Sequence, residues 1–172
     1  MNDKYNQLLA LIGQKIEDED PSNPFQCMDA IFKWCDILGI PHAAVRHLYA
    51  YEVITSPTDL TRQYFDIIYN STTNAPSKGD IVVFGKTVGF AGHVAIATDK
   101  STTKDLVTLD QNWNGLQYLR QVTHYNYYGV IGWLHPKTMT VTDKQKLDMI
   151  QQIVFGGDND SVARSKIKSI FS

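Results

Sequence analysis

Helical periodicity dominates the first third of the chain. Apolar residues recur there at the spacing of amphipathic helices, and this pattern predicts helices over residues 4–16, 26–39 and 42–51. Gly39 and Pro41 mark the end of the second helix. Residues 56–69 are ambiguous, and a fourth helix over 58–69 is one interpretation of them.

Short β-rich runs separated by turn residues follow from residue 71 onward. They cover residues 81–84, 93–98, 106–111, 116–122 and 128–134. Helices followed by a series of antiparallel strands are typical of an α+β fold, and not of a doubly wound parallel sheet.

The composition changes again after Pro136, where two further amphipathic stretches, 142–155 and 160–171, are separated by two glycines. We therefore expect one domain over residues 1–136 and a helical extension over residues 137–172. A lone helical hairpin needs a packing partner. The extension could dock on the domain, begin a binding module or mediate self-association.

Composition and charge exclude several function classes. The 172 residues are 43% hydrophobic and 20% charged, which is the balance of an ordinary globular domain. The formal net charge of −2 comes without a basic stripe, so neither nucleic acid nor an anionic membrane is an expected partner. No run approaches the length of a membrane span, and the N-terminus lacks the apolar core of a signal peptide.

Both cysteines lie in the second predicted helix. Cys27 and Cys35 are separated by about 12 Å along a helix that rises ~1.5 Å per residue, which is too far for a disulfide. Cys35 shares an apolar face with Ile31 and Phe32 and is therefore predicted to be a core residue. Cys27 lies at the helix start, where the helix dipole favours a thiolate.

A predicted hairpin between residues 93–98 and 105–110 gathers polar side chains on one face. If Thr98 pairs with Asp105, the other face is apolar and consists of Val94, Ile96, Val107 and Leu109. His93 then lies opposite Asp110, with Asn112 farther along the same face. An imidazole beside a carboxylate and an amide suits an oriented general base, and together with Cys27 it is the set of a cysteine protease.

The other histidines and several aromatic residues lack such neighbours in the sequence pattern. We expect surface or hydrogen-bonded side chains at His42, His47, His124 and His135. Trp113 alternates onto the core face and is expected to pack there. The three tyrosines Tyr125, Tyr127 and Tyr128 could line a cleft or pack in the core or at an edge strand.

Four short motifs, in order over about residues 4–136, resemble the CHAP family of cysteine, histidine-dependent amidohydrolases and peptidases. They are Gln26-Cys27-Met28-Asp29, Gly79-Asp80-Ile-Val-Val-Phe84, Gly92-His93-Val-Ala-Ile96 and Leu109-Asp110-Gln-Asn112-Trp113. The resemblance implies a papain-like α+β fold and hydrolysis of an amide bond in peptidoglycan. It also implies Cys27 as the nucleophile, His93 as base and then acid, and Asp110 and Asn112 as its polar partners. Endolysin members of the family commonly have Glu at the position of Asp110.

An acidic segment before Cys27 has the spacing of a calcium loop. Positions 1, 3, 5, 7 and 12 of a twelve-residue frame are Asp18, Asp20, Ser22, Pro24 and Asp29. Some calcium-dependent CHAP endolysins resemble this arrangement, with acids nine and seven residues before the cysteine and two after it. We therefore expect Ca²⁺ to bind here and to order the loop that precedes Cys27.

The favoured hypothesis is a peptidoglycan hydrolase of the phage endolysin type, either an N-acetylmuramoyl-L-alanine amidase or an endopeptidase. Its substrate would be the wall of a Gram-positive bacterium, reached through a holin-type pore or from outside the cell. The backbone N–H of Cys27 and the side chain of Gln26 are candidates for the oxyanion site. The alternatives are a non-lytic cysteine amidase or peptidase acting on a small intracellular amide, and a wall-binding module with vestigial catalytic residues.

Overall fold

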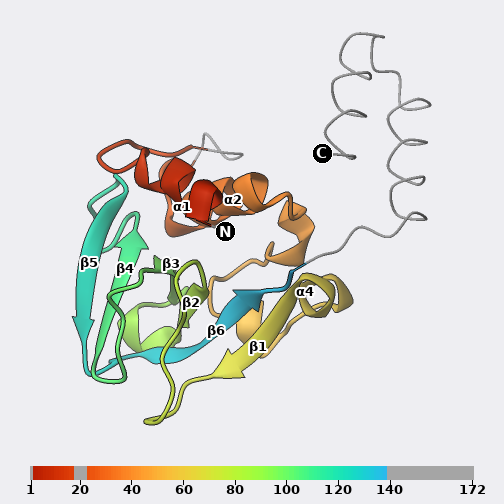
Figure 1. The fold of residues 1–172 in the computed structure, drawn as a ribbon, viewed down its shortest axis with the longest axis vertical. Coiled ribbons are helices and arrows are strands. Elements are labelled where there is room, and N and C mark those ends of the chain that lie inside the picture. The colour runs from red at the N-terminus through yellow and green to blue at the C-terminus, as the bar shows by residue number, and fades with distance from the viewer. Residues whose placement is uncertain (1, 18–22, 139–172) are drawn as a thin grey trace, which may run out of the picture. The chain divides into compact units, whose positions relative to one another are not determined.

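The computed structural model describes residues 2–17 and 23–138, which form helices packed on an antiparallel sheet (Figure 1). From residue 139 on, the predicted helical extension lies outside the described residues. Asp18, Asp20 and Ser22 of the predicted calcium frame also lie outside them. Within the described ranges, no helix combines the length and the apolar character needed to cross a membrane.

The helices are shorter than the periodicity predicts. They are α1 (Asn2–Leu9), α2 (Cys27–Leu38), α3 (Glu52–Thr55) and α4 (Asp59–Tyr64), with 3-10 turns η1 (His42–Ala44) and η2 (Lys86–Val88). Helix α2 confirms the prediction, and Gly39 ends it in the left-handed conformation with φ 76° and ψ 31°. Helix α1 stops early because Gly13 and Gln14 instead exchange backbone hydrogen bonds with Leu119.

Two helix predictions are wrong. The segment 42–51 forms only a 3-10 turn before α3, because its apolar residues do not share one face: Val45 is fully buried, whereas Leu48 is 82% exposed. The interpretation of residues 58–69 as one helix fails at Phe65. From there the chain pairs with the last strand of the sheet, and those ladder hydrogen bonds replace the helical ones.

The described sheet has six antiparallel strands in the order β1-β6-β2-β3-β4-β5. The strands are β1 (Phe65–Tyr69), β2 (Ile81–Phe84), β3 (His93–Ala97), β4 (Asp105–Asp110), β5 (Arg120–Tyr125) and β6 (Val130–Pro136). Strand β2 has the predicted ends, and β3 to β6 correspond to the other predicted β-rich runs with shifted ends. The α+β class is therefore confirmed.

The hairpin of β3 and β4 differs from the predicted register but keeps its faces. Ile96 pairs with Leu109 and Ala97 with Thr108, which moves each partner two residues from the predicted pairing. A shift of two residues preserves which side chains share a face, because the side chains of a strand alternate. His93 and Asp110 therefore stay together, as predicted.

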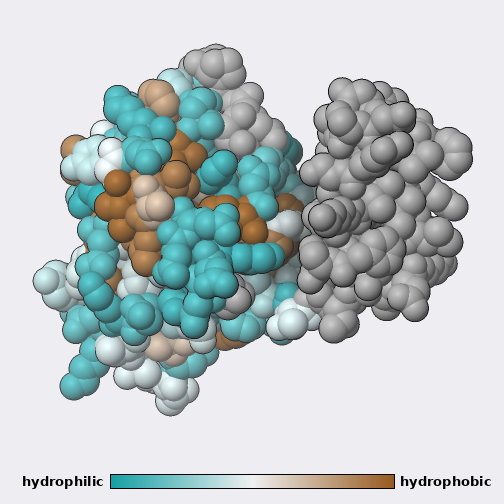
Figure 2. All heavy atoms as spheres, turned by 45° about the horizontal axis from the view of Figure 1, so that its top comes forward, coloured by the Kyte–Doolittle hydropathy of each residue, from teal (hydrophilic) through white to brown (hydrophobic). Residues whose placement is uncertain are grey.

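Hydrophobic clusters cover both faces of the sheet. The cluster beneath α1 and α2 includes Leu8, Ile31, Trp34, Cys35, Ile96 and Leu109, so Cys35 is a core residue as predicted. The cluster on the opposite face includes Val82, Phe84, Ala95, Ala97, Leu106 and Trp133. Hydrophobic residues also reach the surface in patches between hydrophilic ones (Figure 2). The sheet is thus packed on both faces, and close packing fixes the positions of the strand ends that carry the polar residues.

Candidate active site

Cys27 is the first residue of helix α2 and its side chain is half-buried. The helix begins here because Gln26 has an extended backbone and its N–H donates to Asp29 Oδ2 at 2.7 Å, as in a capping box. The carboxylate of Asp29 thereby satisfies a backbone donor at the helix N-terminus. This arrangement places the thiol at the positive end of the helix dipole.

Gln111 is a positioning residue that was not predicted from the sequence. Its buried side chain donates to the backbone oxygens of Ile16 (2.7 Å) and Gln26 (2.9 Å) and accepts from the N–H of Ile16 (2.8 Å). These bonds tie the end of β4 to the residue that precedes Cys27. The only indication of this role in the sequence is that Gln111 lies between two predicted site residues, Asp110 and Asn112.

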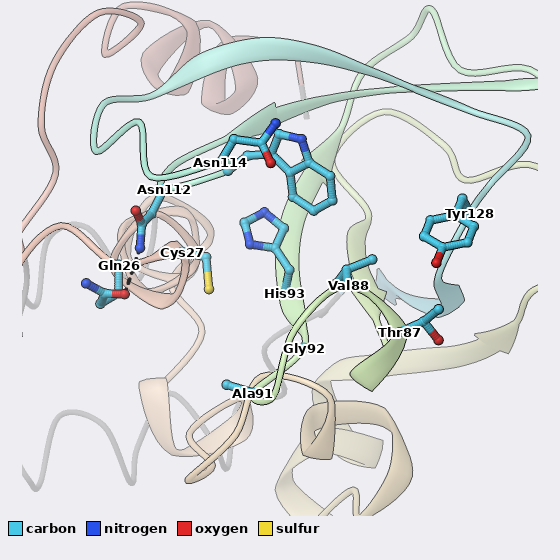
Figure 3. A pocket seen from close by; sticks show the side chains of 11 residues that line it. Gln26, Cys27, Thr87, Val88, Ala91, Gly92, His93, Asn112, Asn114 and Tyr128 are labelled. Carbon is cyan, nitrogen blue, oxygen red and sulfur yellow. Dashed lines mark hydrogen bonds between the residues drawn. The ribbon is translucent and has the colours of Figure 1, made fainter.

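His93 and Asp110 form the centre of the site. Nε2 of His93 lies 2.7 Å from Oδ1 of Asp110, and both side chains are buried. The shorter side chain of aspartate therefore still reaches the imidazole directly. An ionised carboxylate can only accept hydrogen bonds, so Nε2 carries the hydrogen and Nδ1 is left for Cys27. Cys27 and His93 are neighbours in Figure 3.

The electrostatics of the buried groups favour ionised forms. Burial lowers the pKa of His93, but hydrogen bonds with Asp110 and Cys27, together with their charges, outweigh it and raise the pKa to about 10. Burial raises the pKa of Asp110, but hydrogen bonds from His124 and His93 and their charges lower it to about 2. At neutral pH the pair is an imidazolium beside a carboxylate.

His124 also contacts the carboxylate of Asp110, a contact that was not predicted from the sequence. Its Nε2 lies 3.2 Å from Asp110 Oδ2 and 3.0 Å from Thr108 Oγ1, and the hydroxyl of Thr108 donates to the same carboxylate oxygen. Two of the other histidines are hydrogen-bonded, as predicted, although the sequence pattern did not indicate their acidic partners. His42 lies 2.8 Å from Asp36, and His135 lies 2.6 Å from Asp80.

Asn112 lies at the site, but its side chain bonds to a residue other than the predicted one. Its Nδ2 donates to Gln26 Oε1 at 2.8 Å, and Gln26 Nε2 in turn donates to the backbone oxygen of Pro24 at 3.1 Å. Asn112 has φ 62°, a left-handed conformation that asparagine tolerates well. It therefore orients Gln26, whereas the sequence pattern assigned it to His93.

A pocket of about 490 Å³ opens over these residues (Figure 3). Its walls include Gln26, Cys27, Gly92, His93, Asn112, Trp113 and Tyr128. Trp113 is on the pocket wall and not in the core, with its ring centroid 4.9 Å from that of His93. Of the three tyrosines, Tyr128 lines the pocket, Tyr127 packs in the second cluster and Tyr125 is exposed.

Two members of the predicted calcium frame are described and flank Cys27. Pro24 offers its backbone oxygen, which accepts from Gln26 Nε2 and from Gln117 Nε2 at 3.3 Å. Asp29 has a buried carboxylate, whose Oδ2 accepts from the N–H of Gln26. Both present oxygen atoms, the ligand type that Ca²⁺ prefers.

A family model for the CHAP domain matches residues 18–112. No curated protein matches the chain. The wild type endolysin LysIME-EF1 is similar in structure, with 26% identity, a TM-score of 0.55, and coverage of 78% of this chain and 63% of that one.

Two other solved structures share the fold at lower identity. Ly7917 with the hydrolyzing product of MDP is 19% identical, with a TM-score of 0.58 and coverage of 78% of this chain and 62% of that one. An N-acetylmuramoyl-L-alanine amidase from Staphylococcus aureus is 17% identical, with a TM-score of 0.50 and coverage of 72% and 34%. The chain thus spans less than two thirds of the length of each of these three proteins.

Proposed function

Because this chain belongs to the CHAP domain family, we propose that it is a peptidoglycan hydrolase of the endolysin type that uses Cys27 as its nucleophile. The observation that carries this proposal is the line of contacts from Cys27 through His93 to the buried carboxylate of Asp110. A nucleophile, an oriented base and an ionised orienting group are what acyl transfer requires.

The proposed reaction proceeds through a thioester. The thiolate of Cys27 attacks the carbonyl carbon of the amide, and a tetrahedral oxyanion forms. His93 then gives the proton on Nδ1 to the departing amine as the C–N bond breaks. In the second half, Nδ1 takes a proton from water as the oxygen attacks the thioester. The C–S bond then breaks, which releases the Cys27 thiolate and a carboxylic acid that loses its proton to solvent. Asp110 keeps the ring in the tautomer that allows both steps.

The oxyanion would be stabilised at the N-terminus of helix α2. The backbone N–H of Cys27 is one of the helix's first amide groups, and these have no intrahelical acceptor. The side-chain amide of Gln26 is the second candidate donor. Asn112 holds the oxygen of this amide, and the backbone oxygen of Pro24 accepts from its Nε2, so the second N–H of Nε2 is the one left for an oxyanion.

The test is hydrolysis of purified Gram-positive cell walls by the full chain, with mass spectrometry of the soluble fragments. An amidase releases stem peptides with a new N-terminal alanine and leaves the lactyl carboxylate on the sugar. An endopeptidase leaves the lactyl amide intact and releases a new amine within the stem peptide or its cross-bridge. If the wild-type protein releases no more wall fragments than the Cys27→Ser protein, the proposal is contradicted. If it cleaves only small amides and not cell walls, the non-lytic amidase is favoured.

We further propose that Ca²⁺ binds the frame of Asp18, Asp20, Ser22, Pro24 and Asp29. The chemistry of the described donors supports this, since Pro24 and Asp29 present oxygen atoms on either side of Cys27. The ion would supply charge that holds the segment before the nucleophile. Titration calorimetry of the full chain with CaCl₂ should show binding that Asp20→Ala weakens, whereas Asp3→Ala, outside the frame, should not. No heat of binding at millimolar Ca²⁺ would refute the site.

A further inference from the structure

His124 approaches the site from the strand next to Asp110. In the β4–β5 ladder it pairs with Leu106, so its side chain shares a face with Thr108 and Asp110. It is only 6% exposed, and its Nε2 lies within hydrogen-bond distance of both Asp110 Oδ2 and Thr108 Oγ1. The buried imidazole therefore contacts the carboxylate oxygen that His93 does not use.

The proton positions in this network follow from the carboxylate. Ionised Asp110 has no hydrogen to donate, so the groups around it must all be donors. Nε2–H of His93 donates to Oδ1, while the hydroxyl of Thr108 and Nε2–H of His124 donate to Oδ2. The low pKa of Asp110 agrees with this count of donors.

We propose that His124 is a positioning residue for His93, acting by fixing the rotation of the Asp110 carboxylate. With Oδ2 held by two donors from β4 and β5, Oδ1 remains directed at His93 Nε2. Without His124, a buried charged oxygen loses a donor, and such an oxygen turns toward whatever donors remain. That rotation would weaken the bond that holds the imidazole beside Cys27.

A purely structural role for His124 makes a different prediction. Its ring centroid lies 4.8 Å from that of Phe84 and 4.6 Å from that of Trp113, so the imidazole also fills space between two aromatic rings. If filling this space is its whole contribution, an aromatic replacement should preserve the site. If donation to Asp110 matters, a replacement that keeps an N–H at the position of Nε2 should preserve it.

Two variants separate these roles. His124→Phe keeps a ring against Phe84 and Trp113 but has no donor, whereas His124→Gln loses the ring and has an amide N–H of similar reach. The exposed neighbour Tyr125 supplies the control Tyr125→Ala. Neither His124 variant changes the other ionisable groups near it. These are Asp110 on β4, His93 on β3 and Arg120, the strand partner of Asp110.

The readouts do not require a substrate. One is the rate at which iodoacetamide alkylates Cys27 at pH 7, followed by mass spectrometry, in which buried Cys35 acts as an internal reference. The other is the NMR signal of the His93 Nε2–H proton in ¹⁵N-histidine-labelled protein. We expect His124→Phe to slow alkylation about 10- to 100-fold, the effect of losing one hydrogen bond to a charged group, and to broaden or lose the His93 signal. His124→Gln should stay within about fivefold of wild type, less than the loss of that bond, and keep the signal.

The reverse order, with His124→Phe like wild type and His124→Gln impaired, would overturn the proposal. Equal rates and signals in both variants and wild type would overturn it as well. Circular dichroism and melting temperatures identify a variant that does not fold. If this is His124→Phe, His124→Leu, which also lacks a donor, replaces it. The positioning role of His124 matters for catalysis only if the proposed function is correct, and in that respect the inference rests on it. If wild type cuts no wall yet the variants follow the expected order, the proposed function fails and the positioning role stands.

Discussion

Replacing Asp110 with asparagine should slow the enzyme strongly while leaving the fold in place. The carboxylate accepts from His93 at Oδ1 and from Thr108 and His124 at Oδ2. Asparagine has nearly the same volume but only one acceptor oxygen, and its NH₂ group must face one set of donors. When the NH₂ faces His93, it requires an unprotonated Nε2, and the ring then carries its hydrogen on Nδ1, the wrong tautomer for a base.

The size of the effect follows from the hydrogen bond and the charge. Burial lowers the pKa of His93, and Asp110 is the first of the groups that overcome burial and raise it to about 10. A hydrogen bond to a charged group contributes about 1.5–3 kcal/mol, which corresponds to a fall of about one to two units in the pKa of His93. The fraction of enzyme in the wrong tautomer adds to this loss. Together they predict a decrease of about 10²- to 10⁴-fold in kcat.

The decrease is measured as the initial rate of wall lysis by turbidity, alongside an NMR pH titration of His93. The matched control is Asp105→Asn, at the opposite end of β4, which should lyse walls at the wild-type rate. The reasoning would be refuted by a folded Asp110→Asn protein that lyses walls within about threefold of the wild-type rate and has an unchanged His93 pKa. A threefold change is far below the effect of losing one hydrogen bond to a charged group.

Three further predictions concern other parts of the site. Cys27→Ser should abolish wall lysis, whereas Cys35→Ser should retain most of it and lower the melting temperature, because Cys35 is fully buried in the core; turbidity and calorimetry measure the two effects. The raised pKa of His93 stabilises the fold below about pH 6.5 and this contribution, a few kcal/mol, is lost as pH rises toward 10. Urea unfolding at several pH values should therefore show a wild-type advantage over His93→Gln that shrinks from pH 6 to pH 10, and a constant difference would contradict it. Gly92→Ala should destabilise the protein by about 1–3 kcal/mol and reduce lysis, since Gly92 has φ +68° and an added Cβ would overlap the backbone oxygen of Phe84; denaturation midpoints measure the loss.

Much of the fold follows from local sequence patterns. Helix α2 and the strands from β2 to β6 were predicted because their periodicity and turn residues agree with their tertiary environment. Strand β1 was assigned to a helix because Phe65–Tyr69 lacks clear alternation, and its state is decided by pairing with β6, which lies far along the chain. Long-range pairing of this kind leaves no local signal.

The site was predictable where it depends on alternation within a single hairpin. His93 and Asp110 were placed on one face despite an error of two residues in the register, because only the parity of the register matters. The partner of Asn112 was wrong because Asn112 lies beyond β4 in a left-handed conformation, where strand alternation no longer applies. Its amide therefore points to Gln26 and not along the hairpin face.

His124 was missed for a different reason, and that reason bears on why aspartate serves here. Nothing near residue 124 in the sequence is acidic, and its contact with Asp110 arises only from the β4–β5 register. An aspartate is anchored one methylene closer to its strand than a glutamate, so its second oxygen stays within reach of neighbours on the same sheet face. Thr108 precedes it by two residues on that face, and His124 reaches it from the adjacent strand. A longer side chain would carry both oxygens away from these donors, so the donors from β4 and β5 and the short carboxylate form one interdependent arrangement.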